Sequence, residues 1–246
     1  MGGIFKKGVH SAVMEPSSVT GSTIVPLFPL PLVVLPTEPQ MLHIFEERYR
    51  QLVEHVLDQD AQPCCGDFGI IRYDEQQLSE TGTLVRLSKV LHEHEDGRYE
   101  ILTHGLRRFR LIRIVREHDY DSAEIEVLDD GCGGWCDALA SEAFQAHKQL
   151  SQLVTGTCPP DDEYCGKGCL SMFLGQSSGL DLAQRQALLE LDDENDRLRL
   201  LLDHMQRMCQ EIERVACLRQ QIQDNWGLRS FWKDQCEGGE PDCGCE

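Results

Sequence analysis

The side chains best suited to chemistry in this chain are its cysteines. Twelve of them occur in 246 residues. Thiolates are preferred zinc ligands, and structural zinc sites usually show two knuckles in which paired cysteines are closely spaced. The clusters here lack that spacing. They are Cys64 with Cys65, Cys132 with Cys136, the set Cys158, Cys165 and Cys169, and the set Cys236, Cys243 and Cys245. We expect no metal there, although metal binding through the cluster from Cys132 to Cys169 or through the C-terminal cysteines remains an alternative.

Two histidines form a second group that could hold a metal ion. His92 and His94 alternate along a predicted strand, so both imidazoles face one side, and Asp96 lies close by. Polar residues at the end of a hairpin have the same composition. We interpret this group as a solvated hairpin end without a metal.

Nucleophilic catalysis has only a weak candidate. Lys167 and Ser171 are four residues apart, which could pair a serine nucleophile with a lysine base. That spacing arises by chance in most chains. The sequence has no phosphate-binding loop, no Gly-x-Ser-x-Gly elbow and no His-Glu-x-x-His motif. We therefore predict no catalytic residues and no cofactor.

The charge balance restricts the possible partners. Lys and Arg number 23 and Asp and Glu number 42, for a net charge of −19. Such a surface repels nucleic-acid phosphates and anionic membranes. The chain shows neither a secretory signal nor an apolar run near the roughly 20 residues of a spanning helix. We expect a soluble cytoplasmic protein with reduced thiols.

Residues 23–130 carry mainly strand signals, after a flexible leader over residues 1–22. The segment Ile24–Pro36 is apolar but holds four prolines, which cannot donate to a central ladder, so we predict an edge strand and a wrapping loop. Apolar residues at helical spacing predict one amphipathic helix over residues 46–58. Shorter strands are predicted over residues 68–73, 83–91, 99–104, 106–115 and 123–127.

Two details of these strands point to a barrel. Asp96-Gly97 predicts a two-residue hairpin turn in which both φ angles are positive. The apolar pattern of residues 106–115 changes phase, which predicts a bulge or a corner. Short strands with such a change of phase suggest a small closed or half-closed barrel.

A glycine-rich boundary at residues 131–134 separates the strands from a helical subdomain, residues 131–233. Helices are predicted over residues 135–154, 163–174, 181–191 and 194–224. The last has an apolar stripe from Leu198 to Ile222, and we expect it to pack on the other helices rather than form a coiled-coil dimer. The acidic, cysteine-rich tail over residues 234–246 is predicted to be disordered.

A run of arginines stands out in this acidic chain. Its members are Arg107, Arg108, Arg110, Arg113 and Arg116. They could form a strip for an acidic partner or RNA. Cross-strand pairing with Glu124 and Glu126 is the simpler interpretation, which we prefer.

Several motifs occur in an order that resembles the N-terminal domain of Lon proteases. The first are Pro26-Leu27-Phe28-Pro29-Leu30, Val34-Leu35-Pro36, and Leu42-His43-Ile44-Phe45-Glu46 with Arg48 and Tyr49. Downstream come Phe68-Gly69, Gly82-Thr83, Asp96-Gly97-Arg98, and Gly105-Leu106 with Arg108 and Phe109. Together they span residues 24–128, and the helical part resembles the family more weakly.

The resemblance implies an α+β fold, with a PUA-like β-barrel of about six strands and one embedded helix, then a helical bundle with one long helix. In Lon this region helps engage protein substrates and assemble subunits. Lon's ATPase segment and Ser–Lys protease domain are not in this sequence. We therefore expect a non-enzymatic module that binds polypeptides, with an adaptor or chaperone-like role in protein quality control, as a monomer or dimer. RNA binding through the Arg107–Arg116 strip is the alternative.

Two sets of site residues follow. An exposed apolar groove and the arginine strip would bind the partner. Its candidate residues are Phe28, Pro29, Leu30, Leu32, Val33, Arg107 and Arg110. The second set is architectural, with Phe45 and Tyr49 packed into the barrel end and His43 and Arg48 bonded to Glu46. Its members are Pro36, His43, Phe45, Glu46, Arg48, Tyr49, Gly97, Gly105, Arg108 and Phe109.

Overall fold

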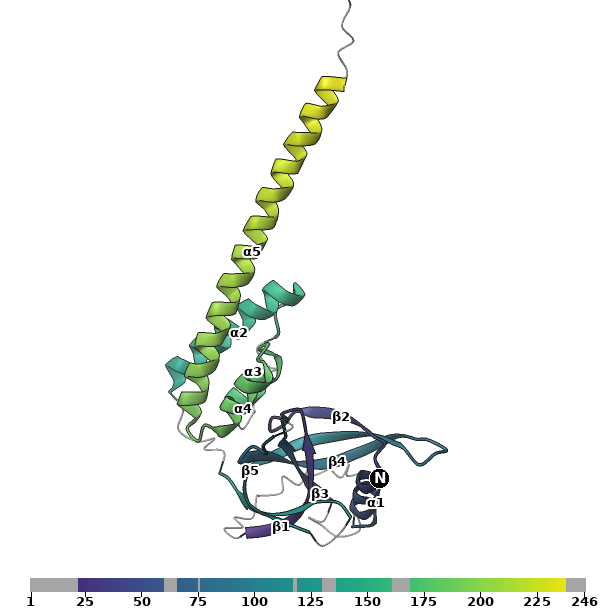
Figure 1. Cartoon of the computed structure of the whole chain (residues 1–246). Coiled ribbons are helices and arrows are strands. Elements are labelled where there is room, and N and C mark those ends of the chain that lie inside the picture. Colours follow the sequence, from purple (N-terminus) through teal and green to yellow (C-terminus); the bar gives the residue numbers. More distant parts are fainter. Residues whose placement is uncertain are drawn as a thin grey trace, which may run out of the picture.

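The computed structural model describes residues 22–59, 66–74, 76–116, 119–129, 136–160 and 169–237 (Figure 1). The strands in this part of the chain are β1 Ser22–Leu30, β2 Pro39–Ile44, β3 Asp67–Arg72, β4 Thr81–Glu93, β5 Tyr99–Val115 and β6 Ser122–Val127. The helices are α1 Glu47–Gln59, α2 Asp137–Thr155, α3 Leu170–Ser177, α4 Leu182–Glu190 and α5 Glu194–Glu237. The leader predicted for residues 1–22 lies outside the described residues except for Ser22, which begins β1.

The strands close into a barrel, as the sequence predicts. They form one six-stranded sheet in the order β2-β5-β4-β3-β1-β6, and β5 also pairs with β6. Closure is possible because β5 is long: Tyr99–His104 pairs with β2, and Phe109–Val115 pairs with β6. The architecture is therefore α+β, with α1 inserted between β2 and β3 and the other helices following the barrel.

Strand β1 is not the edge strand that its prolines predicted. Residues Ser22–Pro26 pair with β6, and residues Leu27–Leu30 pair with β3. Each half of the strand therefore has one partner strand. Pro26 and Pro29 can each turn the side that lacks an N–H away from that partner. The prediction failed because the strand changes partners along its length.

Strand β5 bends where the apolar phase changes. Two of its residues have no partner in the ladder: Leu106, between the pairs of Gly105 and Arg107, and Ile112, between the pairs of Leu111 and Arg113. Each is an extra residue of the kind that forms a bulge. The bulge predicted over residues 106–115 is thus confirmed twice.

The hairpin between β4 and β5 has a longer turn than predicted. Gly97 has a φ of 80°, but no positive φ occurs at Asp96. The Gly97 N–H donates to the His94 carbonyl at 2.9 Å, and the His94 N–H donates to the Arg98 carbonyl at 2.8 Å. This is a loop of residues 95–97 that ends in a left-handed glycine, and the two-residue turn is wrong.

Helix α1 closes one end of the barrel with its apolar face. Tyr49, Leu52, Val53 and Val56 are buried in one cluster with Phe28. The ring centroids of Phe28 and Tyr49 lie 4.0 Å apart. Burial raises the pKa of the Tyr49 hydroxyl above its usual range.

The helical bundle is organised around the first part of α5, which packs against α2 and α3. Leu198, Leu201, Met205 and Cys209 are buried there, as predicted for intramolecular packing. Helix α4 begins with a reciprocal capping box between Asp181 and Gln184.

The second part of α5 projects beyond α2 (Figure 1). Its apolar residues Leu218, Ile222 and Trp226 are 44%, 55% and 67% exposed. The helix continues to Glu237, so residues 234–237 are helical and not part of a disordered tail. Within the described residues, no helix combines the length and apolar character needed to span a membrane.

Candidate functional site

Barrel and helices are held together by a buried arginine. Arg108 on β5 is 0% exposed. Its guanidinium donates to the carbonyls of Leu189 at 3.0 Å and Leu191 at 2.8 Å after α4, and to the carbonyl of Asp129 at 3.0 Å. Five donors in a rigid fork suit arginine to this task. These contacts form the centre of what we call the joint, the contact between the barrel and α3–α5.

A strained turn forms the second part of the joint. The Glu38 N–H donates to the Leu35 carbonyl at 3.1 Å, with Pro36 and Thr37 between them. Thr37 has a φ of 68°, which a β-branched residue rarely adopts. Gln176 of α3 donates to the Pro36 carbonyl and to the Thr37 hydroxyl at 3.1 and 2.9 Å, which holds the strained turn against the bundle.

A buried ion pair stiffens the bundle beside the joint. Glu194 and Arg197 on α5 are 2% and 0% exposed and lie 2.9 Å apart. Glu194 also accepts from the Ser171 N–H and hydroxyl, at 2.8 and 2.5 Å. Arg197 donates to the Leu191 carbonyl at 2.7 Å, so this oxygen receives bonds from both Arg197 and Arg108.

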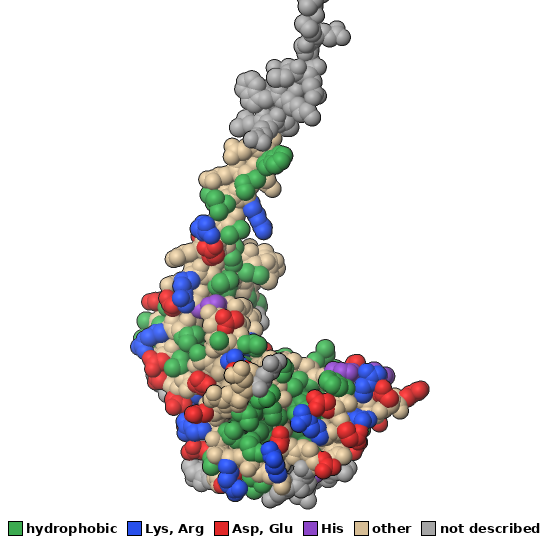
Figure 2. Space-filling view, viewed as in Figure 1, with side chains coloured by type: hydrophobic (Ala, Val, Ile, Leu, Met, Phe, Trp, Pro, Cys, Tyr) green, Lys and Arg blue, Asp and Glu red, His purple; other side chains and the backbone are tan. Residues whose placement is uncertain are grey.

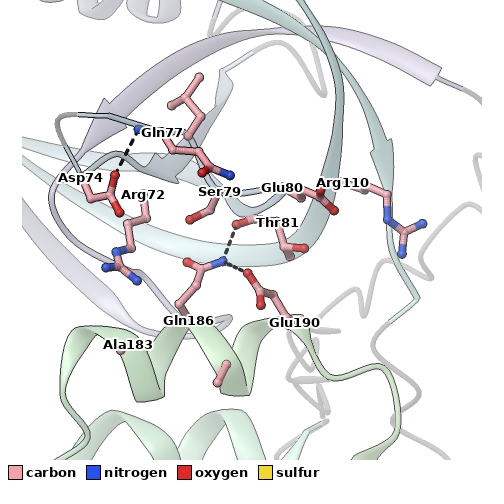
Figure 3. A pocket seen from close by; sticks show the side chains of 12 residues that line it. Arg72, Asp74, Gln77, Ser79, Glu80, Thr81, Arg110, Ala183, Gln186 and Glu190 are labelled. Carbon is pink, nitrogen blue, oxygen red and sulfur yellow. Dashed lines mark hydrogen bonds between the residues drawn. The ribbon is translucent and has the colours of Figure 1, made fainter.

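A polar cavity of about 600 Å³ opens between the barrel and α4 (Figure 3). Gln186 of α4 lies at its base and donates to the Thr81 carbonyl at 3.1 Å and to Glu190 at 2.7 Å. Its side-chain oxygen is buried without a hydrogen-bond partner among the described residues. Charged groups of both signs line the walls: Arg72, Asp74, Glu80, Arg110 and Glu190. This mixture is suited to polar ligands, but neither positive nor negative side chains predominate, so the lining does not select a ligand of one charge.

Strand β2 has one open edge. In the described sheet it pairs only with β5. The Thr37 N–H donates to the Gly105 carbonyl and the Gly105 N–H to the Glu38 carbonyl, both at 2.9 Å. Counting from this bulge in steps of two, the backbone groups of Gln40, Leu42 and Ile44 face β5. Those of Met41 and His43 face outward, and Pro39 has no N–H to offer at this edge.

The outer face of β2 is partly apolar. Leu42 and Ile44 are buried, while Met41 is 66% exposed and Phe45, just after the strand, is 61% exposed. His43 lies between them and is also exposed. A strand that presents both unpaired backbone groups and apolar side chains is a template for an added strand. Arg50 forms an ion pair with Glu47 nearby and donates to the Asp96 carbonyl at 2.9 Å.

The predicted apolar groove is not formed as expected. Phe28 and Val33 are 4% and 6% exposed, in the barrel cluster and the helical cluster respectively. Leu30 and Leu32 are partly buried against the barrel cluster, and Pro29 is half-buried. The sequence suggested exposure because it treated this segment as an edge, whereas the barrel core and the helical bundle cover its side chains.

The arginines of this run lie in different environments. Arg110 lies 3.1 Å from Glu126 and Arg113 lies 2.6 Å from Glu124, which confirms the predicted cross-strand pairing. Arg107 is half-buried. Arg108 is the buried centre of the joint, and nothing in the run itself distinguishes it from its neighbours.

The remaining motif residues are placed as follows. Arg48 lies 3.0 Å from Glu46, whereas His43 stacks on Phe45 with a centroid separation of 6.0 Å. The exposed Phe45 ring does not enter the barrel end, contrary to prediction, because the chain turns at that residue and only Tyr49 faces inward. Phe109 is fully buried against Gly69 and Gly82. A side chain at Gly105 would lie 2.2 Å from the Leu35 carbonyl, so only glycine fits.

The described cysteines do not assemble into one cluster. Cys136 and Cys158 are free and exposed, the first just before α2 and the second three residues after its end. Cys169 forms a disulfide bond, so the prediction of reduced thiols is wrong there. Cys64, Cys65, Cys132, Cys165, Cys243, Cys245 and the side chain of Cys236 lie outside the described residues.

The fold is thus a closed β-barrel followed by a helical bundle, with a buried joint between them. The sequence model of the ATP-dependent protease La (LON) substrate-binding domain matches residues 24–207. The chain therefore belongs to the LON substrate-binding domain family.

Similar proteins agree with this assignment. The chain is 23% identical over 219 residues to Lon protease 2 of Herpetosiphon aurantiacus, covering 83% of this chain and 26% of that protein. It is 26% identical over 140 residues to Lon protease 2 of Myxococcus xanthus, covering 53% and 16%. The chain thus spans about a quarter or less of these relatives.

Two solved structures share the fold. The Lon N-terminal domain protein from Xanthomonas campestris has a TM-score of 0.57 at 27% identity, covering 74% of this chain and 98% of that one. The N-terminal domain of a Mycobacterium avium complex Lon protease has a TM-score of 0.55 at 19% identity, covering 75% and 98%. At that identity the second shows the fold alone.

Proposed function

We propose that this chain is a non-enzymatic module that binds extended polypeptide segments along the open edge of β2. The observation that carries the proposal is the combination at that edge of outward backbone groups with the exposed side chains of Met41 and Phe45. Membership of the substrate-binding domain family supports a polypeptide as the ligand.

Strand addition would supply both affinity and selectivity. A segment lying beside β2 would exchange backbone hydrogen bonds with His43 and donate to or accept from Met41. Met41, His43 and Phe45 project from the same face of β2, so they would contact alternate residues of the ligand. Since Gln40 already donates to the Met41 carbonyl at 2.8 Å, the ligand must displace that side chain or bond beside it. Apolar side chains in an otherwise extended segment fit this surface best.

The finer role is an adaptor or chaperone-like function in protein quality control, in the cytoplasm. It rests on the similarity to Lon proteases, whose ATPase and protease activities we do not transfer to this chain. A net charge of −19 would keep such a carrier soluble when apolar segments are bound. RNA binding is the less favoured alternative, because Arg110 and Arg113 are engaged with Glu126 and Glu124.

Fluorescence anisotropy with a labelled, permanently unfolded polypeptide tests the proposal. Met41→Asp combined with Phe45→Asp should weaken binding at least about tenfold, equivalent to 1.4 kcal/mol, because apolar anchors dominate such contacts. Val154→Asp is the matched control, since Val154 is also exposed, at 65%, but lies on helix α2, which presents no open strand edge. Equal weakening by both changes would contradict the assignment to β2.

Amide hydrogen exchange locates the ligand independently. Bound polypeptide should slow exchange at the Met41 and His43 amides and leave the Leu42 amide, which already bonds β5, unchanged. Protection confined to the cavity beside α4 would move the binding site there. Salt-dependent binding of RNA with protection of β5 and β6 would favour the alternative function.

A further inference from the structure

We propose that His43, His94 and Glu100 form a binding site for a divalent transition-metal ion of the zinc class on the outer face of the barrel. One ligand atom from each residue can be chosen so that all three lie within 4.8 Å of one another. Among the described residues this is the one group of His, Cys, Asp and Glu with such convergence. Neither the family match nor the proposed polypeptide binding assigns it.

The sheet register brings the ligands together. His43 of β2 lies directly opposite Glu100 of β5, and Glu100 lies directly opposite His92 of β4. Residues opposite each other in an antiparallel pair point to the same face, with Cβ atoms about 4.5–5.5 Å apart. His94, at the start of the hairpin turn, adds its ring from the side: its Nε2 lies 3.3 Å from the nearer carboxylate oxygen of Glu100.

The donor set decides the kind of ion. Two imidazoles and one carboxylate suit zinc and its first-row neighbours, whereas magnesium and calcium prefer a shell of oxygen atoms. Three protein ligands leave a coordination position for water or for a ligand of the domain. Tetrahedral coordination at zinc–ligand distances of about 2.0–2.1 Å requires the ligand atoms to approach to about 3.4 Å. Because His43 and Glu100 are exposed, their side chains can rotate inward without disturbing the core.

Neighbouring groups support this arrangement. His92 packs edge-on against His94, with ring centroids 4.4 Å apart, which orients the His94 ring. His43 stacks on Phe45. Asp96, which the sequence placed in this group, is instead bonded to Arg98 at 2.7 Å. In Figure 2 histidine side chains gather next to basic and acidic ones toward the pointed end of the barrel.

Zinc titration of the full chain tests the site, after its accessible thiols have been alkylated so that cysteines do not compete. Long-range ¹H–¹⁵N spectra should show one ion shifting the ring nitrogens of His43 and His94. His43→Ala and Glu100→Gln should each weaken zinc binding at least about tenfold, since even the loss of a group that supports a ligand typically costs about that much. The matched controls are His104→Ala, on the same strand as Glu100 but bonded to Ser88, and Glu126→Gln, which should leave affinity unchanged.

Several results would overturn the assignment. The first is the absence of zinc binding when free zinc is in about a hundredfold excess over a micromolar dissociation constant. The second is an equal loss of zinc affinity in His43→Ala and His104→Ala. The third is displacement of zinc by equimolar magnesium. Thermal melting of the metal-free variants should match that of the unaltered chain, because the three ligands are at the surface. This test is separate from polypeptide binding, because zinc can bind whether or not β2 accepts a strand.

Discussion

Arg108 and Arg110 lie two positions apart on β5, yet the protein uses them in opposite ways. Arg108 is 0% exposed and donates to backbone carbonyls from both sides of the joint. The side chain of Arg110 is 46% exposed and faces Glu126, itself 57% exposed. The joint therefore surrounds its arginine with backbone acceptors, whereas the outer wall of the barrel leaves its charges in water.

This difference separates stability from recognition. A buried guanidinium is costly to desolvate, so it contributes only while every bond is made, and any change at the joint should be felt by the whole molecule. Exposed ion pairs contribute little because water and salt screen them. The candidate sites, β2 and the histidine group, lie on the outer wall, where side chains can change partner without cost to the fold.

The largest loss of stability should follow Glu194→Gln. This change keeps the size of the side chain but leaves the charge of Arg197, which is 0% exposed, without its buried partner. Breaking such a pair costs about 3–5 kcal/mol. Urea unfolding followed by circular dichroism measures the change. An unaltered midpoint would mean that water reaches Arg197 and that the joint region is not as closed as the contacts imply.

Arg108→Met should cost about 3 kcal/mol, because the buried carbonyl of Leu189 loses its donor and others lose part of their bonding. Arg110→Met is the matched control on the same strand and should stay within about 0.5 kcal/mol of the unaltered chain. The same unfolding experiment reports both. Similar effects of the two changes would remove the distinction between joint and outer wall.

The effects of Arg108→Met and Glu194→Gln on stability should also be coupled. Arg108 and Arg197 both donate to the Leu191 carbonyl, at 2.8 and 2.7 Å. Residues that share a partner show coupling energies of about 0.5–3 kcal/mol in double-mutant cycles. Arg108→Met combined with Glu194→Gln should therefore destabilise by an amount different from the sum of the single effects. Strict additivity would indicate two independent clusters.

Gly105→Ala should destabilise by about 1–3 kcal/mol, since the added carbon would meet the Leu35 carbonyl at 2.2 Å and force the turn at Pro36 and Thr37 to move. Gly156→Ala is a contrasting change, because nothing lies within 4 Å of its added carbon, although its φ of 74° still carries backbone strain. Calorimetry compares the two melting temperatures. A smaller effect at Gly105 than at Gly156 would show that the turn is pliable.

The sequence predicts local features well and distant pairings poorly. The helix over residues 46–58, the Asp181 cap and the bulge over residues 106–115 are written in adjacent residues, and the structure has all three. The resemblance to Lon N-terminal domains provided the closed barrel, since its motifs occur in one order along the chain.

What the sequence could not show depends on residues far apart. Arg108 looks like any member of its run, because the carbonyls that bury it come from Leu189 and Leu191, after α4. Phe28 and Val33 looked exposed because the helices that cover them, α1 for Phe28 and the helical bundle for Val33, lie elsewhere in the sequence. The histidine group was judged from His92, His94 and Asp96, whereas the register across β2 and β5 replaces His92 and Asp96 with His43 and Glu100. One unpredicted pairing is enough to change the chemistry of a site.

The smallest expected effect concerns pH at the outer wall. A hydrogen bond from the Ser22 side chain, followed by a hydrogen bond and attraction from Arg113, lowers the pKa of Glu124 below its ordinary value of 4.5. A carboxylate whose pKa is lower in the folded state contributes stability that is fully present above that ordinary value and is lost as the pH falls through the folded pKa. Glu124→Gln should therefore lower the melting temperature slightly at neutral pH, and the difference from the unaltered chain should disappear as the pH falls below about 4.5. A larger change than that from Glu194→Gln would reverse the comparison between wall and joint, because an exposed pair would then outweigh a buried one.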